Sequence, residues 1–534
     1  MPVQKKYIPL LLGVAVAFGI FLGARLNFTT VSDTLFSSNS KKQKLNRLID
    51  FIDFEYVDKV NTDSIVDITV NTILENLDPH SVYIPSNEYE QTANDMRGNF
   101  TGIGISFYQH QDSIAVIRTI EDGPAQKAGI LPGDRILFAD TTPLFGKGLN
   151  RYDVISQLKG ARNTQVTLKI KRKDTDSLLS FSVTREKIPL LSLDAAYLLT
   201  DTVGYIKLNR FAEPTYNEFK KALTDLKKNG ATTLVLDLRD NPGGYISTAQ
   251  DIVDEFLQEN TLILITKNKN GTQEKTYATQ KGSFKTGGLY VLINENSASA
   301  SEIVAGALQD NDKGVIVGRR SFGKGLVQRE MALGDGSAVR LTIARYYTPT
   351  GRSIQRPYNK GNDAYYNEYE SRYVNGEMQN KDSIVVNDSL RFVTPKGKVV
   401  YGGGGIIPDV FVGKDTSQEN QAISYILRGG FMSYFAFEYL ETHRQDFKGQ
   451  TQEDYITNYN ISEATLNAFL SYANITEPNT FKGYTARLKL VIKATLARQL
   501  YGTQAYEMIL HSQDPMIKKV LQLQQKSAGA EQLY

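Results

Sequence analysis

The segment Asn294-Glu295-Asn296-Ser297-Ala298-Ser299-Ala300-Ser301-Glu302 places three serines among small residues. It lies between a predicted strand at 289–293 and a predicted helix at 300–308. Small neighbours leave a serine hydroxyl uncovered, and the free N–H groups at a helix start favour negative charge developing beside it. A nucleophilic serine is therefore one interpretation. The other is that these serines simply cap the helix.

A lysine between two glycines is the second chemical signal, in Arg320-Ser321-Phe322-Gly323-Lys324-Gly325-Leu326-Val327-Gln328. If the fold buries the amine of Lys324, desolvation lowers its pKa and the neutral amine can act as a base. Gln328, four residues on, could hydrogen-bond that amine and orient it. The alternatives are a surface lysine or a phosphate-binding loop, but the GxxxxGK[ST] pattern of such a loop does not occur in the chain.

A serine nucleophile needs a base, and histidine is the usual one. The chain has four histidines, and none of them lies in the segments described above; they are His80, His110, His443 and His511. A Ser–Lys pair therefore fits this sequence better than a Ser–His–Asp triad. An esterase of the α/β-hydrolase type would also need a GxSxG elbow, where this chain has Ser-Ala-Ser-Ala-Ser.

Two adjacent glycines end the segment Asp237-Leu238-Arg239-Asp240-Asn241-Pro242-Gly243-Gly244, which follows a predicted buried strand at 233–238. Gly243 and Gly244 let the backbone approach a ligand closely and turn its amides inward, where they can hold an oxyanion. An ordinary strand-to-helix turn is the alternative.

A glycine-rich turn leads into an edge-type strand at Thr101-Gly102-Ile103-Gly104-Ile105-Ser106-Phe107. Loop amides of this kind can bind a terminal carboxylate, and the strand edge can pair with an extended peptide. The segments Gly123-Pro124-Ala125-Gln126-Lys127-Ala128-Gly129-Ile130 and Pro132-Gly133-Asp134-Arg135-Ile136-Leu137 follow in order. The expected contacts are Gly102, Ile103, Gly104, Ile105 and Phe107.

Changes in hydrophobic period divide the chain into the regions that must position these residues. We expect a helical region at 41–98, a β-rich domain at 99–186, an α/β domain at 187–415 and a helical domain at 416–534. A polar, Tyr- and Asn-rich stretch at about 356–401 is interpreted as an insertion lying on the surface.

The N-terminus predicts a membrane-directed segment. Lys5 and Lys6 precede an apolar run that extends to about Leu26, with a Ser/Thr/Asn-rich linker at 27–40. About twenty helical residues span the bilayer core, and the paired lysines should stay on the cytoplasmic side. We expect an anchor at 1–26; a cleaved signal peptide and a buried core helix are the alternatives.

The composition of the chain excludes further classes of functional site. The net charge is +3 over 534 residues, which gives no electrostatic reason to expect a nucleic-acid partner. The chain has no cysteine, which excludes disulfides, thiol catalysis and thiolate metal sites.

Taken together in their order, these segments resemble the C-terminal processing peptidases, also called tail-specific proteases, which are Ser/Lys endopeptidases with a PDZ domain. The match covers roughly residues 44–413. The matching segments are LDPHS at 77–81, TGIGI at 101–105, GPAQKAGILPGDRI at 123–136, LDLRDNPGG at 236–244, NENSASASEI at 294–303, SFGKGLVQ at 321–328, YYTPTGRSIQ at 346–355 and GGIIPD at 404–409.

The resemblance implies an α/β core of the crotonase/ClpP-like type with an inserted PDZ domain that docks substrate tails. It implies Ser299 as nucleophile, Lys324 as general base and Gln328 as its orienting partner. The amide of Ala300 and the backbone at Gly243-Gly244 are the implied oxyanion donors. No metal or other cofactor is implied.

We therefore expect an exported serine endopeptidase on the periplasmic side of the bacterial inner membrane. Its substrates should be polypeptides whose accessible C-termini end in small or apolar residues. The alternative is a PDZ peptide-binding scaffold with a vestigial protease core. The insertion at 356–401 and the helices after 416 depart from the minimal family layout, and those helices could mediate homo-oligomerisation or bind an adaptor.

Overall fold

The computed structural model describes residues 40–110, 113–146, 150–173, 175–414, 421–475, 481 and 483–531, with the isolated positions 13 and 16. The expected anchor at 1–26 and linker at 27–40 thus fall outside the described residues, apart from single positions. Within those ranges, no helix is both long and apolar enough to cross a bilayer.

The chain divides after Ile73 into two units. The first contains helices at the two places where helical spacing predicted them, α3 (Ser40–Glu55) and α4 (Thr62–Glu75). Asn61 supports the start of α4, because its side chain accepts a hydrogen bond from the Ser64 amide at 3.1 Å.

A six-stranded sheet forms the centre of the second unit, in the order β10-β11-β12-β15-β16-β21. All pairs are parallel except β10 with β11. Every residue of β12 is buried, because helices cover both faces of the sheet. The strands are β10 (Leu193–Thr200), β11 (Val203–Leu208), β12 (Thr233–Asp237), β15 (Gly288–Ile293), β16 (Val315–Gly318) and β21 (Val410–Phe411); the helices on one face are α8 (Thr215–Lys228), α9 (Ile246–Asp254) and α10 (Ala300–Asp310).

A second sheet brings an N-terminal segment to the core. Its strand order is β1-β18-β13-β14, and β17 also pairs with β18. Val82 of β1 pairs with Arg340 of β18, so the loop at 77–81 is held next to β18, whose other edge pairs with the strand that carries Gln328. These strands are β1 (Val82–Ile84), β13 (Leu262–Asn268), β14 (Gln273–Tyr277), β17 (Leu326–Ala332) and β18 (Ala338–Tyr347).

The β-rich domain has its own core and lies between α5 (Ser86–Arg97) and β10 along the chain. Its main sheet runs β3-β4-β5-β7-β8, with β6 on β5, and β2 pairs with β9. The elements are β2 (Asn99–Gly102), β3 (Ile105–His110), β4 (Ser113–Thr119), α6 (Pro124–Lys127), β5 (Arg135–Ala139), β6 (Thr142–Pro143), α7 (Arg151–Leu158), β7 (Gln165–Lys171), β8 (Leu179–Thr184) and β9 (Glu186–Pro189).

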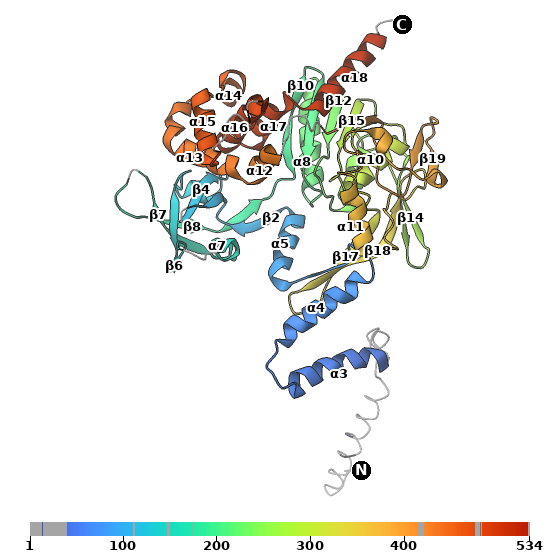
Figure 1. Ribbon diagram of the computed structural model, residues 1–534, viewed down its shortest axis with the longest axis horizontal. Helices are drawn as coiled ribbons and strands as arrows, with labels where there is room; N and C mark the ends of the chain where they lie inside the picture. The colour runs from blue at the N-terminus through green and yellow to red at the C-terminus, as the bar shows by residue number, and fades with distance from the viewer. Residues whose placement is uncertain are drawn as a thin grey trace, which may run out of the picture. The chain divides into compact units, whose positions relative to one another are not determined.

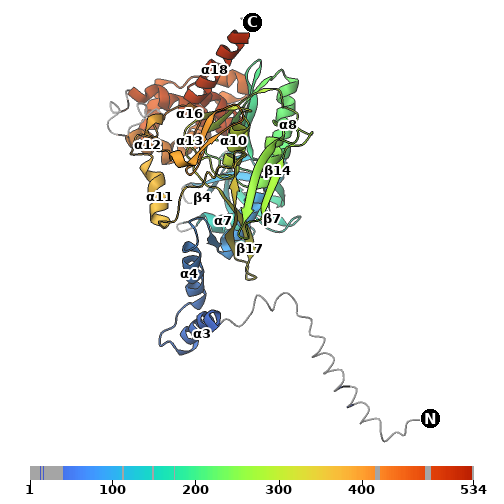
Figure 2. The same ribbon diagram turned by 90° about the vertical axis from the view of Figure 1, so that its right-hand side faces the viewer.

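Helices dominate after residue 421 and lie together in both views (Figure 1, Figure 2). One of them packs on the β-rich domain: Phe437 is buried against Ala115 and Ile117, and Arg135 forms an ion pair of 2.7 Å with Glu441. The elements are α12 (Gln421–Arg428), α13 (Phe431–His443), η4 (Arg444–Phe447), α14 (Gln452–Asn458), α15 (Glu463–Tyr472), α16 (Thr485–Leu500), α17 (Thr503–His511) and α18 (Pro515–Glu531).

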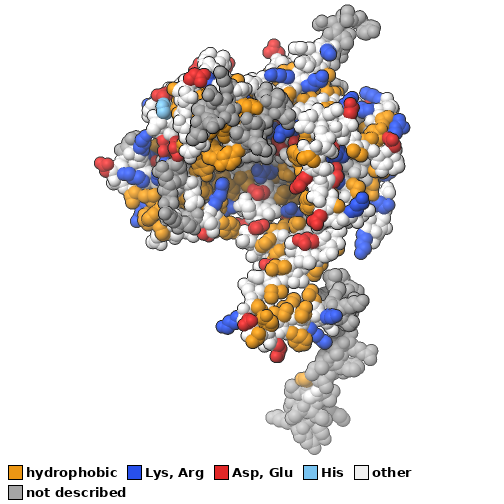
Figure 3. Space-filling model, in the orientation of Figure 1, with side chains coloured by type: hydrophobic (Ala, Val, Ile, Leu, Met, Phe, Trp, Pro, Cys, Tyr) orange, Lys and Arg blue, Asp and Glu red, His pale blue; other side chains and the backbone are white. Residues whose placement is uncertain are grey.

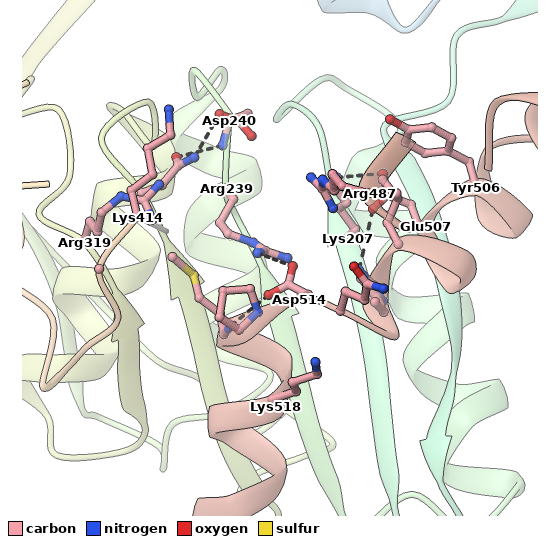
Figure 4. Close-up of a pocket in the computed structure, with 17 residues that line it drawn as sticks. Lys207, Arg239, Asp240, Arg319, Lys414, Arg487, Tyr506, Glu507, Asp514 and Lys518 are labelled. Atoms are coloured by element: carbon pink, nitrogen blue, oxygen red, sulfur yellow. Dashed lines mark hydrogen bonds and ion pairs between the residues drawn. The ribbon is translucent and has the colours of Figure 1, made fainter. Parts of the chain in front are cut away.

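Charged pairs fasten α17 and α18 to the carboxyl ends of the parallel strands, as Figure 4 shows. Arg239 Nη1 lies 2.6 Å from Asp514, and Lys207 Nζ lies 2.7 Å from Glu507. Apolar side chains of α18, among them Met516 and Ile517, complete this contact by covering the second face of the sheet. The helical C-terminal domain therefore contacts both the β-rich domain and the core.

The stretch at 356–401 lies largely on the surface, as its polar composition suggested, but several of its side chains anchor it in the interior. Arg356, Tyr365 and Arg372 are buried, with exposed fractions of 1% or less. Ion pairs make this possible, because Glu368 lies within 3.3 Å of three arginines. Its elements are α11 (Asn362–Ser371), η2 (Lys381–Ser383), η3 (Asp388–Leu390), β19 (Arg391–Val393) and β20 (Val399–Tyr401).

Basic and acidic side chains are interspersed over the face drawn in Figure 3. That distribution matches the nearly balanced composition of 61 basic and 58 acidic residues.

Candidate active site

Ser299 lies between the end of β15 and the start of α10, with a φ of 54° and a ψ of −112°. A non-glycine residue rarely adopts this conformation, and holding it costs about 1–3 kcal/mol. The side chain is half-buried between the buried residues Ala298 and Ala300. The backbone thus presents a serine hydroxyl at the edge of the sheet from a strained turn, next to the N-terminus of a helix.

The glycine turn after β12 lies directly against Ser299. A Cβ on Gly243 would come within 2.8 Å of Ala298 O and Ala300 N and within 2.9 Å of Ser299 Cβ. Its φ is also 101°, so glycine is required here on both counts.

The three amides expected to bind an oxyanion differ in what they already bind. Gly243 N–H donates to Asn241 Oδ1 at 2.9 Å, so it is not free in this structure. The N–H groups of Ala300 and Gly244 donate no hydrogen bond within the described part of the chain. The absence of a side chain at Gly243 makes room for the turn. The N–H groups available to bind an oxyanion are those of Gly244 and Ala300.

Lys324 Nζ donates to Gln328 Oε1 at 2.7 Å, and Gln328 Nε2 in turn donates to the carbonyl of His80. Burial, reinforced by the positive charge of Arg340, lowers the pKa of Lys324 to about 8 against the opposing effect of Asp78 and Glu302. No hydrogen bond joins Lys324 Nζ to Ser299 Oγ in the described structure. The amine is therefore poised to lose its proton near neutral pH and is oriented by Gln328.

Glu302 links the two loops, a role that sequence reasoning missed. Its carboxylate is fully buried and accepts hydrogen bonds from the amides of Ser299 (2.9 Å), Gly323 (2.7 Å) and Lys324 (2.8 Å) and from Ser321 Oγ (2.5 Å). Burial raises its pKa, although these four donors oppose the shift. The only sequence signal was its position three residues after Ser299, where a glutamate accepts from the N-cap amide.

His80 also belongs to this site, although it lies outside the serine and lysine segments in which the sequence predicted chemistry. Its ring nitrogen Nε2 lies 2.8 Å from the Tyr365 hydroxyl, and its ring packs edge-on to Phe322. Burial, followed by the charge of Lys324, lowers the pKa of His80 to about 3, so the ring is neutral at ordinary pH. The usable signal was the LDPHS segment, whose Asp78 accepts hydrogen bonds from the amides of His80 and Ser81.

The β-rich domain forms a separate groove of about 190 Å³. All five residues expected to contact a peptide line it, namely Gly102, Ile103, Gly104, Ile105 and Phe107. Ile155 and Leu158 of α7 face them, and Gln91 and Asn94 of α5 close the groove from outside the domain. Its floor is apolar and its rim carries Arg151.

Four larger cavities, of about 570, 1070, 420 and 310 Å³, are lined by neither Ser299 nor Lys324. Across the ranges that the structure describes, no group of three or more His, Asp or Glu side chains is placed to hold a metal ion.

Replacing Glu302 with glutamine should destabilise the fold. The amide NH2 of Glu302→Gln would face backbone donors and leave at least one of them unpaired and buried, at a cost of about 3 kcal/mol. Urea unfolding followed by tyrosine fluorescence measures this loss. Glu274→Gln, on the exposed strand β14, is the matched control; equal stability of the two variants would contradict the central role of Glu302.

Three regions of the chain match known family models. Residues 202–361 match the model of peptidase family S41, residues 101–183 match a PDZ domain, and residues 422–502 match a family of unknown function, DUF8443. The photosystem II D1 C-terminal processing protease is a solved structure with 26% identity, covering 70% of this chain and 87% of that one at a TM-score of 0.36.

Curated relatives carry the family assignment. The chain is 35% identical to a carboxy-terminal-processing protease of Bartonella bacilliformis over 344 residues, which are 63% of this chain and 78% of that protein. It is 33% identical to the carboxy-terminal processing protease CtpB of Bacillus subtilis, covering 59% of this chain and 65% of the relative. The chain therefore belongs to peptidase family S41 and is a carboxy-terminal processing serine protease with a PDZ domain.

Proposed function

We propose that Ser299 and Lys324 are the catalytic dyad of this protease and that Gln328 orients the lysine. The observation that carries the proposal is the shared carboxylate of Glu302, which binds the amide of Ser299 and the amide of Lys324 at the same time. Two loops from neighbouring parallel strands are thereby held at one point.

The chemistry follows from the protonation state of the amine. A neutral lysine has two N–H bonds and one lone pair; Gln328 Oε1 accepts one of the N–H bonds and so directs the lone pair elsewhere. With a peptide bound, Ser299 Oγ attacks the scissile carbonyl carbon while its proton moves to Lys324 Nζ. The developing oxyanion is stabilised by the free amides of Ala300 and Gly244.

The tetrahedral adduct then collapses. The C–N bond breaks, the leaving amine takes the proton from Lys324, and an acyl ester remains on Ser299. A water molecule gives a proton to the same lysine as it attacks the ester, and the proton returns to Ser299 Oγ when the acyl group departs. Every proton is accounted for by one lysine, with no imidazole in the cycle.

The groove of the PDZ domain supplies the substrate end of the proposal. The glycine turn at Gly102 and Gly104 and the apolar floor formed by Ile103, Ile105 and Phe107 suit a terminal carboxylate followed by an apolar side chain. We infer that unstructured C-terminal tails ending in small or apolar residues dock there before cleavage.

Single substitutions test the dyad. Ser299→Ala and Lys324→Ala should each lower kcat/KM on an unstructured model protein by at least about a thousandfold, since neither the nucleophile nor the base can be replaced. Far-ultraviolet circular dichroism should show both variants folded. Cleavage by either variant at the wild-type rate would remove that residue from the mechanism.

The pH profile tests the state of the lysine. Because the folded protein lowers the pKa of Lys324, the neutral base becomes available as pH rises through about 8. At pH 7 roughly a tenth of the amine is neutral. The value of kcat/KM should therefore rise nearly tenfold per pH unit well below the pKa of about 8 and level off above it. A flat profile between pH 6.5 and 9.5 would mean that another group provides the base.

We also propose that the apolar run ending near Leu26 anchors the chain, with the protease on the periplasmic side. Lys5 and Lys6 before the run support this orientation. In a bacterial host the full-length protein should stay with the membrane after carbonate washing, and added protease should digest it in spheroplasts but not in intact cells. Release by carbonate would favour a cleaved signal peptide, and protection in spheroplasts would contradict the orientation.

A further inference from the structure

The stretch at 356–401 contacts the loop before Ser299, the loop that holds Lys324 and the segment that holds His80. Tyr369 Oη donates to Asn296 Oδ1 at 2.6 Å on the loop before Ser299. Arg372 Nη1 donates to the carbonyl of Ser321 at 2.8 Å on the lysine loop. Tyr366 Oη donates to the carbonyl of Pro79 at 3.0 Å, next to His80. The helix α11 therefore braces the site from one side.

Stacking fixes the position of α11 on the lysine loop. The guanidinium of Arg356 lies 4.3 Å from the ring centre of Phe322 and 4.0 Å from that of Tyr365. Its backbone amide donates to the carbonyl of Gly323 at 3.0 Å. The two rings lie 6.4 Å apart and are tilted by 68° to each other, so the buried cation contacts both at one corner and limits how far Tyr365 can move relative to Lys324.

Hydrogen bonds lead from Tyr365 to the amine in three steps. The Tyr365 hydroxyl lies 2.8 Å from His80 Nε2. The carbonyl of His80 accepts from Gln328 Nε2, and Gln328 Oε1 accepts from Lys324 Nζ at 2.7 Å. The side-chain amide of Gln328 binds both partners at once, through Oε1 to Lys324 and through Nε2 to His80. The rotamer of Gln328 therefore depends on where His80 is held.

We propose that Tyr365 is a positioning residue for Lys324, acting through His80 and Gln328. The inference rests on the proposed dyad and adds to it a group from the stretch at 356–401. Tyr365 keeps its proton, since burial raises its pKa to about 12, and it can donate to a neutral imidazole. The charged or titratable groups around this relay are Asp78, Arg356, Glu302 and Arg340.

Tyr365→Phe removes only the hydroxyl and keeps the ring that Arg356 stacks on. We expect kcat/KM to fall about fivefold to tenfold, mostly through kcat, the effect of one lost orienting hydrogen bond. The rising part of the kcat/KM profile should also shift to higher pH, because an amine that is held less firmly gains contact with water and its pKa rises. Tyr358→Phe is the matched control, because Tyr358 lies in the same stretch and its hydroxyl accepts a hydrogen bond from Arg345 of β18. The activity of this variant should stay within about twofold of wild type.

A double-mutant cycle separates positioning from general stability. If Tyr365 acts through Gln328, Tyr365→Phe should cost less than about twofold when Gln328→Ala is already present. If steady-state turnover of Gln328→Ala is too slow, the rate of Ser299 modification by a fluorophosphonate replaces it. An equal loss in both backgrounds, or no loss and no pH shift in the wild-type background, would overturn the inference.

Two single variants distinguish a failure of this inference from a failure of the proposed dyad. If Lys324→Ala cleaves substrate normally, the dyad itself fails. If Lys324→Ala is inactive and Tyr365→Phe behaves as wild type at every pH, the dyad stands and only the relay is wrong.

Discussion

A single buried carboxylate sets the geometry of this active site. Glu302 accepts four hydrogen bonds, and its donors come from the turn that holds Ser299 and from the loop that holds Lys324. Burying an unpaired carboxylate would cost several kcal/mol, whereas each hydrogen bond to a charged group returns about 1.5–3 kcal/mol. The site is stable only when both loops are in place, which means that the proposed nucleophile and the proposed base cannot be positioned independently.

In the stretch at 356–401, buried arginines and the carboxylates beside them depend on one another in the same way. Arg356 and Arg372 are fully buried and share Glu368, while Arg320 forms a bidentate pair with Glu377. Two nitrogens of Arg356 have no hydrogen-bond partner in the described structure, and contact of the guanidinium with the rings of Phe322 and Tyr365 compensates in part. The stretch is mostly exposed, and its buried arginines are accommodated because a neighbouring carboxylate neutralises them.

The sequence contained enough to predict the central elements. The continuous apolar run at 233–238 predicted β12, and the three chemical loops all follow strands of the same sheet. Strand β18 was not predicted, although apolar and polar residues alternate along 339–343 at the period of a strand. His80, Glu302 and Tyr365 could not be assigned from the sequence, since their roles depend on contacts between segments that are far apart in the chain.

Distance along the chain has a consequence for biosynthesis. The proposed relay joins His80, which is made early, to Gln328 and Tyr365, which are nearly 250 and 285 residues further on. A polypeptide that emerges N-terminus first has a complete PDZ domain long before it has an oriented base. During synthesis the PDZ groove can therefore be complete while the residues proposed to hold and orient the base are still missing.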